Sequence, residues 1–134
     1  MSKRVWNIDF ITDRDDIMEY VNKHYNKASE SLREQSAGEL ECDTPVDITF
    51  DSDGDTTILS LNIIYNKKEL PYYFLKTYIK YDGNKNRISM SYNRHKEKIS
   101  IKSKKDFKKQ FYKILLKEST GSMINHLLRL NNLM

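Results

Sequence analysis

The sequence predicts a single α+β domain in which helices cover one face of an antiparallel sheet of about five to six strands. The chain has 134 residues, which is the usual length of one domain. Apolar residues recur at every second position between Pro45 and Lys102, as they do in half-buried strands. Before and after this region they recur at helical spacing. Together these segments give the order β-α-β-β-β-β-β-α-α over residues 1–134.

The first element is expected to be a strand, because residues 4–11 (RVWNIDFI) form a short run that favours β structure. A helix should follow it. Thr12 is suited to cap the helix, and Asp15 stands at the fourth position of a capping box. Ile17, Tyr20, Val21 and His24 then follow at helical spacing, and Gly38 is expected to end the helix.

Five strands of a meander are expected next. They are VDITF, TTILSLNIIY, YYFLKTYIKY, RISMSY and KISIKS, beginning at residues 46, 56, 72, 87 and 98. In each of them apolar residues alternate with polar ones, which indicates one face on the core and one face in water. In the first strand, Val46, Ile48 and Phe50 are therefore expected to face inward.

The segment DSDGD (51–55) resembles part of a calcium loop, but its spacing does not fit one. An EF-hand needs glycine at position 6 and glutamate at position 12. Counted from Asp51, glycine is at position 4 and position 12 is Asn62. Since the segment joins two alternating runs, we predict the tight corner of a β-hairpin.

The C-terminal third is expected to be helical. Ser103 can cap a helix in which Phe107, Phe111, Ile114 and Leu115 share one face. Residues 123–133 are apolar enough to form a short final helix. Packing on the domain's own core is the expected role of this helix, and a homodimer contact is the alternative.

Charge is divided unevenly along the chain. Residues 1–55 carry six Lys/Arg and fourteen Asp/Glu, a net charge of −8, whereas residues 56–134 carry seventeen and five, a net charge of +12. No basic residue occurs between Arg33 and Lys67. Such an asymmetry concerns partners and association rather than the fold, and it has this meaning only if the two signs stay apart in the folded domain.

The acidic segment 39–55 is the first candidate site. Carboxylates without counter-charges suit docking on a basic protein surface, where complementary charge speeds and orients the encounter. The order of elements is similar to that of several small bacterial immunity and inhibitor proteins, and this resemblance implies a non-enzymatic partner of another protein. The expected protein-binding residues are Glu39, Glu41, Asp43, Asp47, Asp51, Asp53 and Asp55.

A nucleic-acid-binding face is the alternative. Basic and aromatic side chains are interleaved on the strands between residues 76 and 102, and phosphates need cations while unstacked bases need rings. A lysine-decorated, solvated face is the simpler explanation of the same pattern. The residues concerned are Lys76, Tyr78, Lys80, Arg87, Arg94, Lys98 and Lys102.

No motif for catalysis, a metal or a cofactor occurs in the sequence, so none is expected. His24, His95 and His126 are scattered, and His24 is expected to be a packing residue. Cys42 is the only cysteine, and its acidic neighbours should raise its pKa. An enzyme would need groups that meet only in the fold. No run is long enough to span a membrane, and a cytoplasmic location is expected.

Overall fold

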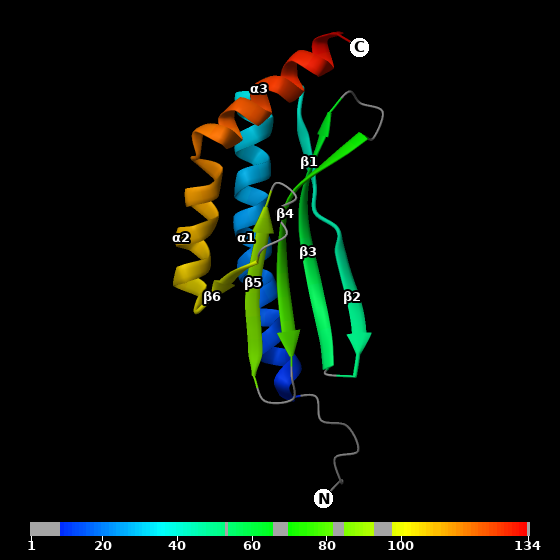
Figure 1. The fold of residues 1–134 in the computed structure, drawn as a ribbon, viewed down its shortest axis with the longest axis vertical. Helices are drawn as coiled ribbons and strands as arrows, with labels where there is room; N and C mark the ends of the chain where they lie inside the picture. The colour runs from blue at the N-terminus through cyan, green and yellow to red at the C-terminus, as the bar shows by residue number, and fades with distance from the viewer. Residues whose placement is uncertain (1–8, 53, 66–69, 82–84, 93–97, 134) are drawn as a thin grey trace, which may run out of the picture.

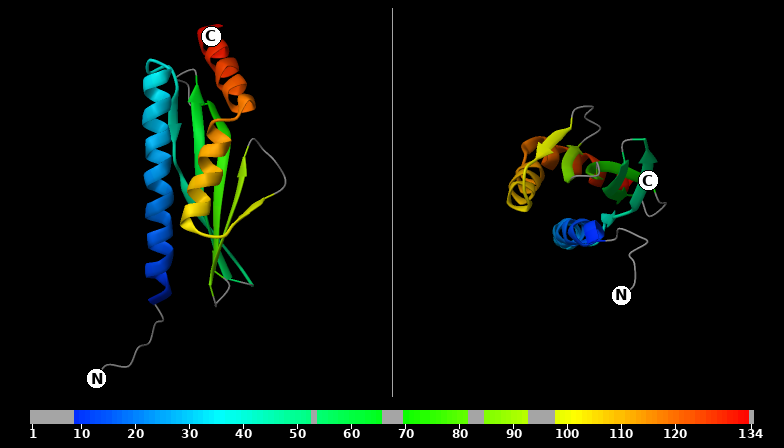
Figure 2. Two further views of the ribbon diagram at one scale, coloured as in Figure 1. Left: turned by 90° about the vertical axis from the view of Figure 1, so that its left-hand side faces the viewer. Right: turned by 90° about the horizontal axis from the view of Figure 1, so that it is seen from below.

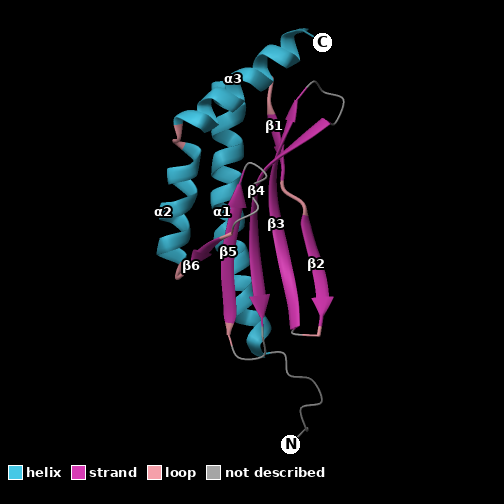
Figure 3. Ribbon diagram, in the orientation of Figure 1, coloured by secondary structure: helices cyan, strands magenta, loops and turns pink. Residues whose placement is uncertain are grey.

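In a computed structural model of the chain, the described residues are 9–52, 54–65, 70–81, 85–92 and 98–133. The helices are α1 (Asp9–Gln35), α2 (Lys104–Leu115) and α3 (Glu118–Leu133). The strands are β1 (Glu41–Asp43), β2 (Val46–Asp51), β3 (Gly54–Tyr65), β4 (Leu70–Tyr81), β5 (Asn86–Tyr92) and β6 (Ile99–Ile101). The predicted α+β class is confirmed (Figures 1 and 3).

The six strands form one antiparallel sheet in which β3 and β4 are central. β1 and β2 pair one after the other with the same side of β3, and the order continues through β4 and β5 to β6 (Figure 1). The register of β3 with β4 shifts between Leu61 and Asn62, where Phe74 is the extra residue of a bulge. The sheet therefore has two lateral edges, β1–β2 and β6.

The helices lie on one face of this sheet. α1 and α2 run side by side over it, as both views of Figure 2 show, and α3 continues past the end of α2. Tyr25 of α1, Phe107 and Phe111 of α2, and Leu127 of α3 are buried against the inward residues of the strands. None of the described helices lies over the other sheet face, and we call it the open face.

Both predicted C-terminal helices are confirmed. The Ser103 hydroxyl accepts from the Asp106 N–H at 3.1 Å, and the Asp106 carboxylate accepts from the Lys102 N–H at 3.0 Å. These bonds satisfy backbone donors at the start of α2. In the 123–133 segment, Leu127 is buried and three apolar neighbours pack on the core, so its expected packing role is also confirmed.

The predicted opening strand is wrong where the structure describes it. Asp9–Ile11 are the first residues of α1, and residues 4–8 lie outside the described part. Thr12 is thus inside the helix rather than its cap. No glycine or proline separates residues 9–11 from the rest of α1. The helix can therefore extend through them, because each added residue gains a hydrogen bond without a new nucleation step.

Helix α1 ends one residue earlier than predicted, because Ala37, and not only Gly38, adopts the left-handed conformation that stops it. The Gly38 N–H donates to the Arg33 C=O at 2.8 Å, and the Ala37 N–H donates to the Glu34 C=O at 3.2 Å. This pair of bonds is a Schellman motif. Gly38 has φ 81°, but Ala37 also has a positive φ of 54°, a conformation that alanine rarely adopts.

The DSDGD corner is confirmed as a hairpin, because Asp51 pairs with Gly54 at the turn between β2 and β3. Asp53 itself lies outside the described residues. The short strand β1 was not predicted. Its two charged residues flank one half-buried residue, Cys42, and three residues are too few to show an alternation.

One expectation about the core is wrong. Val46, Ile48 and Phe50 of β2 are 46%, 49% and 78% exposed. They are on the helix side of the sheet, since Val46 pairs with the core residue Leu59. However, α1 contacts the sheet mainly at β1 and β3, and α2 contacts it at β6, so the helix layer leaves β2 uncovered.

Candidate functional site

The first candidate site is the outer edge formed by β2. A row of apolar side chains stands on its helix side, and acidic side chains stand on its open side. The two sides can be assigned because the Tyr25 hydroxyl bonds the Leu59 carbonyl at 3.0 Å and the Thr77 hydroxyl at 2.6 Å. Residues in register with Leu59 therefore face α1, and their neighbours, including Asp47, face away.

The predicted acidic residues are only partly brought together. Glu41, Asp43 and Asp47 are exposed and share the open face, because Cys42 between the first two is half-buried on the helix side. Glu39 is exposed in the loop before β1. Asp51 ends β2. Asp55 lies half-buried on β3, where it pairs with Phe50 and Tyr81, so it does not belong to the exposed group.

Basic residues occupy the other half of the open face. Lys76, Tyr78 and Lys80 of β4 lie there, Arg87 of β5 pairs with Lys80, and Lys98 flanks β6 on the same side. Tyr73 also lies there, with the Lys76 ammonium 5.2 Å from its ring centroid. Lys102 is exposed just after β6, and Arg94 lies outside the described residues.

Opposite charges are therefore separated on the open face. β3 lies between them and contributes uncharged residues such as Thr56 and Ile58. Two strand spacings amount to about 10 Å. This is close to the distance over which physiological salt screens exposed charges. The attraction between the acidic and basic halves of the open face is therefore weak.

On the helix side the separation fails. α1, which begins in an acidic stretch, packs directly beside the lysine-rich α2. The Lys104 ammonium lies 5.8 Å from the Tyr20 ring centroid. The net charges of the two chain halves thus do not become two poles of the domain. Only the open face keeps the division that the sequence suggested.

Tyr78, the proposed stacking residue of the nucleic-acid alternative, is already occupied. The Lys98 ammonium lies 3.9 Å from the centroid of its ring. A base would have to displace this cation, whose interaction at an exposed site is worth about 0.5–1 kcal/mol. Base stacking is worth about 1–3 kcal/mol. A base could therefore displace Lys98 from the Tyr78 ring, but the lost cation–π contact would reduce the net free energy of binding.

His24 is a packing residue, as expected. It is 4% exposed on α1, and its Nδ1 lies 2.9 Å from the Tyr112 hydroxyl of α2. Tyr20 meets the ring edge-on at 4.7 Å. Burial, followed by the charges of Lys27, Lys108 and Lys23, lowers the pKa of His24. The neutral ring therefore helps to join the two helices.

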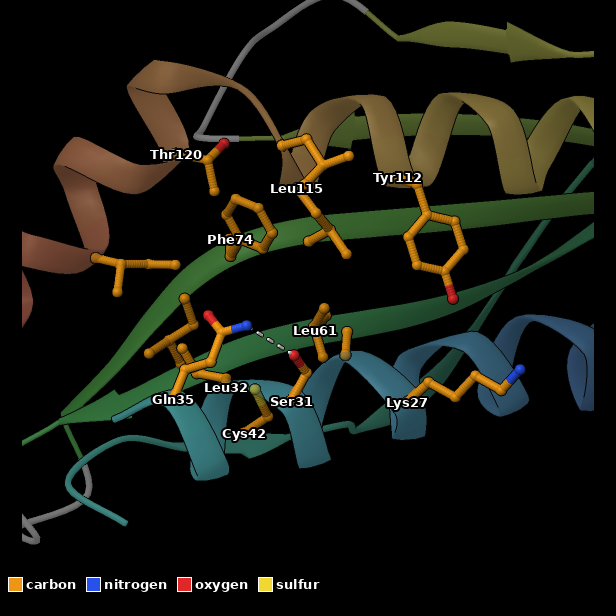
Figure 4. A pocket seen from close by; sticks show the side chains of 14 residues that line it. Lys27, Ser31, Leu32, Gln35, Cys42, Leu61, Phe74, Tyr112, Leu115 and Thr120 are labelled. Carbon is orange, nitrogen blue, oxygen red and sulfur yellow. Dashed lines mark hydrogen bonds between the residues drawn. The ribbon is translucent and has the colours of Figure 1, made fainter. Parts of the chain in front are cut away.

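A second candidate is a pocket of about 390 Å³ between α1 and the α2–α3 junction, with β3 and β4 as its floor (Figure 4). Leu61, Phe74 and Leu115 make it mainly apolar. Cys42 also lines it, and burial raises the pKa of this thiol to about 11. The sequence anticipated the direction of this shift but attributed it to acidic neighbours. A protonated thiol is a poor nucleophile at neutral pH.

The sequence missed the residues that distinguish the β2 edge most. The apolar–polar alternation of residues 46–50 predicted Val46, Ile48 and Phe50 to be core residues. Only the position of the helices shows that they are exposed. One signal was present: this apolar run lies inside the segment without any basic residue, between two sharp turns. An exposed apolar patch rimmed by polar residues is typical of surfaces that contact other molecules.

No family model, curated protein or solved structure matches this chain. Within the described part of the chain, no group of three His, Cys, Asp or Glu residues is placed to hold a metal ion. No helix among those described has both the length and the apolar character needed to cross a membrane.

Proposed function

We propose that this domain is a non-enzymatic binding protein, of the inhibitor or immunity type, that docks on another protein through the β2 edge. The acidic face of the edge orients the encounter, and its apolar side supplies the main contact energy. The observation that supports this proposal is the exposure of Val46, Ile48 and Phe50 on a strand that also carries Asp47.

The apolar row is difficult to explain as an ordinary surface. Edge strands are usually protected by charge, by proline or by a covering element. Here Asp47 supplies charge on one side of the edge, but three large apolar residues occupy successive positions on the other side, and Phe50 is 78% exposed. Burying such side chains in an interface is worth about 25 cal/mol per Å² of apolar area, so a partner would gain substantially by covering them.

Charge indicates what kind of partner fits. Glu41, Asp43 and Asp47 stand on the open side of the same edge. These carboxylates would attract a protein surface that presents Lys or Arg once it comes within about a Debye length. They would also favour one orientation of that surface. The acidic edge repels phosphate groups, which favours a basic protein over a nucleic acid at this position.

The nucleic-acid alternative is retained for one reason. Lys76, Lys80 and Arg87 lie on adjacent strands of the open face, and no helix in the described part of the chain lies above them. Such a surface can track a phosphate backbone. Against it are the covered ring of Tyr78 and the carboxylates at the far side of the same face. Its binding would fall steeply with salt, and Tyr78→Ala would weaken it.

Capture from the native cell extract, with and without nuclease, separates the two candidates. We expect the purified domain to retain one protein at a fixed stoichiometry after nuclease treatment. The cytoplasm is the proposed setting, because the single cysteine forms no internal disulfide. Retention that depends on nucleic acid would replace the first proposal with the second.

The charge variant Glu41→Lys, Asp43→Lys, Asp47→Lys gives the sharper test. Its matched control carries the same changes at Glu30, Glu34 and Glu118, which are exposed on α1 and α3. Association with the captured partner should slow by about tenfold or more in the first variant and remain nearly unchanged in the control. Equal association rates for both variants would refute docking through the acidic edge.

A further inference from the structure

The direction of the backbone groups on β2 follows from one hydrogen bond. In an antiparallel pair of strands, residues that exchange backbone hydrogen bonds alternate with residues that do not. The Ser60 N–H donates to the Pro45 C=O at 3.0 Å, and the register then assigns the bonded pairs to Asp47–Ile58 and Thr49–Thr56. Val46, Ile48 and Phe50 consequently direct their backbone N–H and C=O groups away from β3.

One of these outward groups is occupied by a side chain of the same strand. The Ile48 N–H donates to Oδ1 of Asp47 at 2.9 Å. This bond satisfies the central outward donor of the edge and places a carboxylate beside it. Charge at an edge is a common protection against unwanted strand pairing. Unlike a proline or a covering helix, this protection can be removed by moving a single side chain.

On this basis, and resting on the proposed function above, we propose that the partner binds by adding an extended segment to the β2 edge. The segment alternates apolar residues with Lys or Arg. Its apolar residues lie beside Val46, Ile48 and Phe50, and its cations lie beside Asp47 and the carboxylates of β1. Backbone hydrogen bonds supply general affinity, and the alternating side chains supply selectivity.

Asp47 acts as an exchangeable cap in this binding mode. A cation from the incoming segment attracts the Asp47 carboxylate, which releases the Ile48 N–H. The freed N–H then donates to a backbone carbonyl of the segment. The protein thus gains an ion pair and keeps the amide bonded, whereas a neutral segment would bond the amide but offer the displaced Asp47 carboxylate no cation.

A second copy of this chain fits the edge less well. Antiparallel pairing of two β2 strands through their outward groups, centred on Ile48, would join the apolar rows. It would also place the two Asp47 side chains on the same face as diagonal neighbours, about 7–8 Å apart. Like charges at this separation oppose pairing, so the charge of the edge favours a basic strand over itself.

The test uses synthetic peptides on the full-length protein. The probe is a labelled six-residue peptide that alternates lysine and valine. Its affinity is measured by fluorescence anisotropy, and hydrogen exchange of the Ile48 and Phe50 amides is followed by NMR. We expect binding that slows exchange of both amides. Failure of this peptide to bind, or binding that leaves both amides unprotected, would overturn strand addition.

Two N-methylated peptides identify the backbone pairing. One is methylated on the valine amides and the other on the lysine amides, so that each loses the donors of one edge. One of the two should bind about tenfold or more weakly than the parent, and which one it is gives the strand direction. Equal affinity of both would show that only side chains make contact.

The cap is tested at Asp47 with a neutral peptide that alternates serine and valine. Asp47→Ala frees the Ile48 N–H and should raise the affinity for this peptide several-fold. Asp47→Asn keeps an acceptor oxygen beside the amide and should not. Identical affinities of the two variants would refute the exchange step.

These results are separable from the proposed function. If the native partner depends on the acidic edge but both methylated peptides bind like the parent, docking stands and strand addition falls. If the peptides behave as expected but no protein is captured through this edge, the proposed function falls instead.

Discussion

The two lateral edges of the sheet have similar sequence patterns and opposite environments. β2 alternates apolar residues with Asp and Thr, and β6 with its flanking residues 98 and 102 alternates them with Ser and Lys. Yet Ile48 of β2 is 49% exposed, whereas Ile101 of β6 is 5% exposed. α2 packs on β6, and its Asp106 also bonds the backbone just after that strand. The difference teaches that alternation assigns residues to a face but does not show whether anything covers that face.

The position of the helix layer has an identifiable cause. The Tyr25 hydroxyl bonds both β3 and β4, and its ring lies 5.6 Å from that of Phe111 on α2. These contacts hold α1 over the middle of the sheet with α2 on the β6 side. Two helices in these positions cover β1 and β3 to β6 and leave β2 bare, and the bare strand is where we place the partner.

The largest expected effect comes from a matched pair of truncations at the two edges. Ile101→Ala should lower the free energy of unfolding by about 2–4 kcal/mol, because it leaves a cavity under α2. Ile48→Ala should lower it by less than about 1 kcal/mol, because that side chain is half in water. Urea denaturation of both variants measures the difference, and equal losses would break the comparison.

The next effect concerns the residue that positions α1. Tyr25→Phe removes the hydroxyl from a buried site and leaves Thr77 without that partner, so we expect a loss of about 1–3 kcal/mol in unfolding free energy. Tyr73→Phe is the control, since Tyr73 is 46% exposed on the open face. Thermal and urea unfolding should rank the two variants clearly. A Tyr25→Phe variant as stable as the control would mean that other contacts position the helix.

A smaller effect, of opposite sign, is expected where the chain passes from α1 toward the bare edge. Ala37 has a positive φ of 54°, which costs alanine about 1 kcal/mol and glycine almost nothing. Ala37→Gly should therefore stabilise the domain by roughly this amount. A denaturant midpoint at or below that of the wild type would contradict the left-handed geometry at this position.

The smallest effect should be a pH dependence on the covered side. The pKa of His24 is lowered in the folded domain, so the unfolded chain binds a proton first as the pH falls below about 6.5. Stability should then decrease with falling pH more in the wild type than in His24→Gln, and the two should run parallel above about pH 7.5. Parallel curves across the whole range would show that His24 does not contribute.

The local structure followed largely from the sequence, and the site did not. Alternation placed five of the six strands, and the spacing of Phe107, Phe111 and Ile114 placed α2. These signals depend on near neighbours. The exposure of Phe50, the role of Tyr25 and the joining of α1 to α2 at His24 depend on residues distant in sequence. Periodicity is the same for a covered strand and a bare one.

The most direct test of the central claim is photocrosslinking in the native cell from a photoreactive residue substituted at Phe50. Leu116 is the control, because it is also a large exposed apolar residue, at 83%, but lies at the α2–α3 junction. A discrete protein adduct from position 50, absent from position 116, is the predicted result. The same adducts from both positions, or none from position 50, would contradict the assignment of the β2 edge as the binding surface.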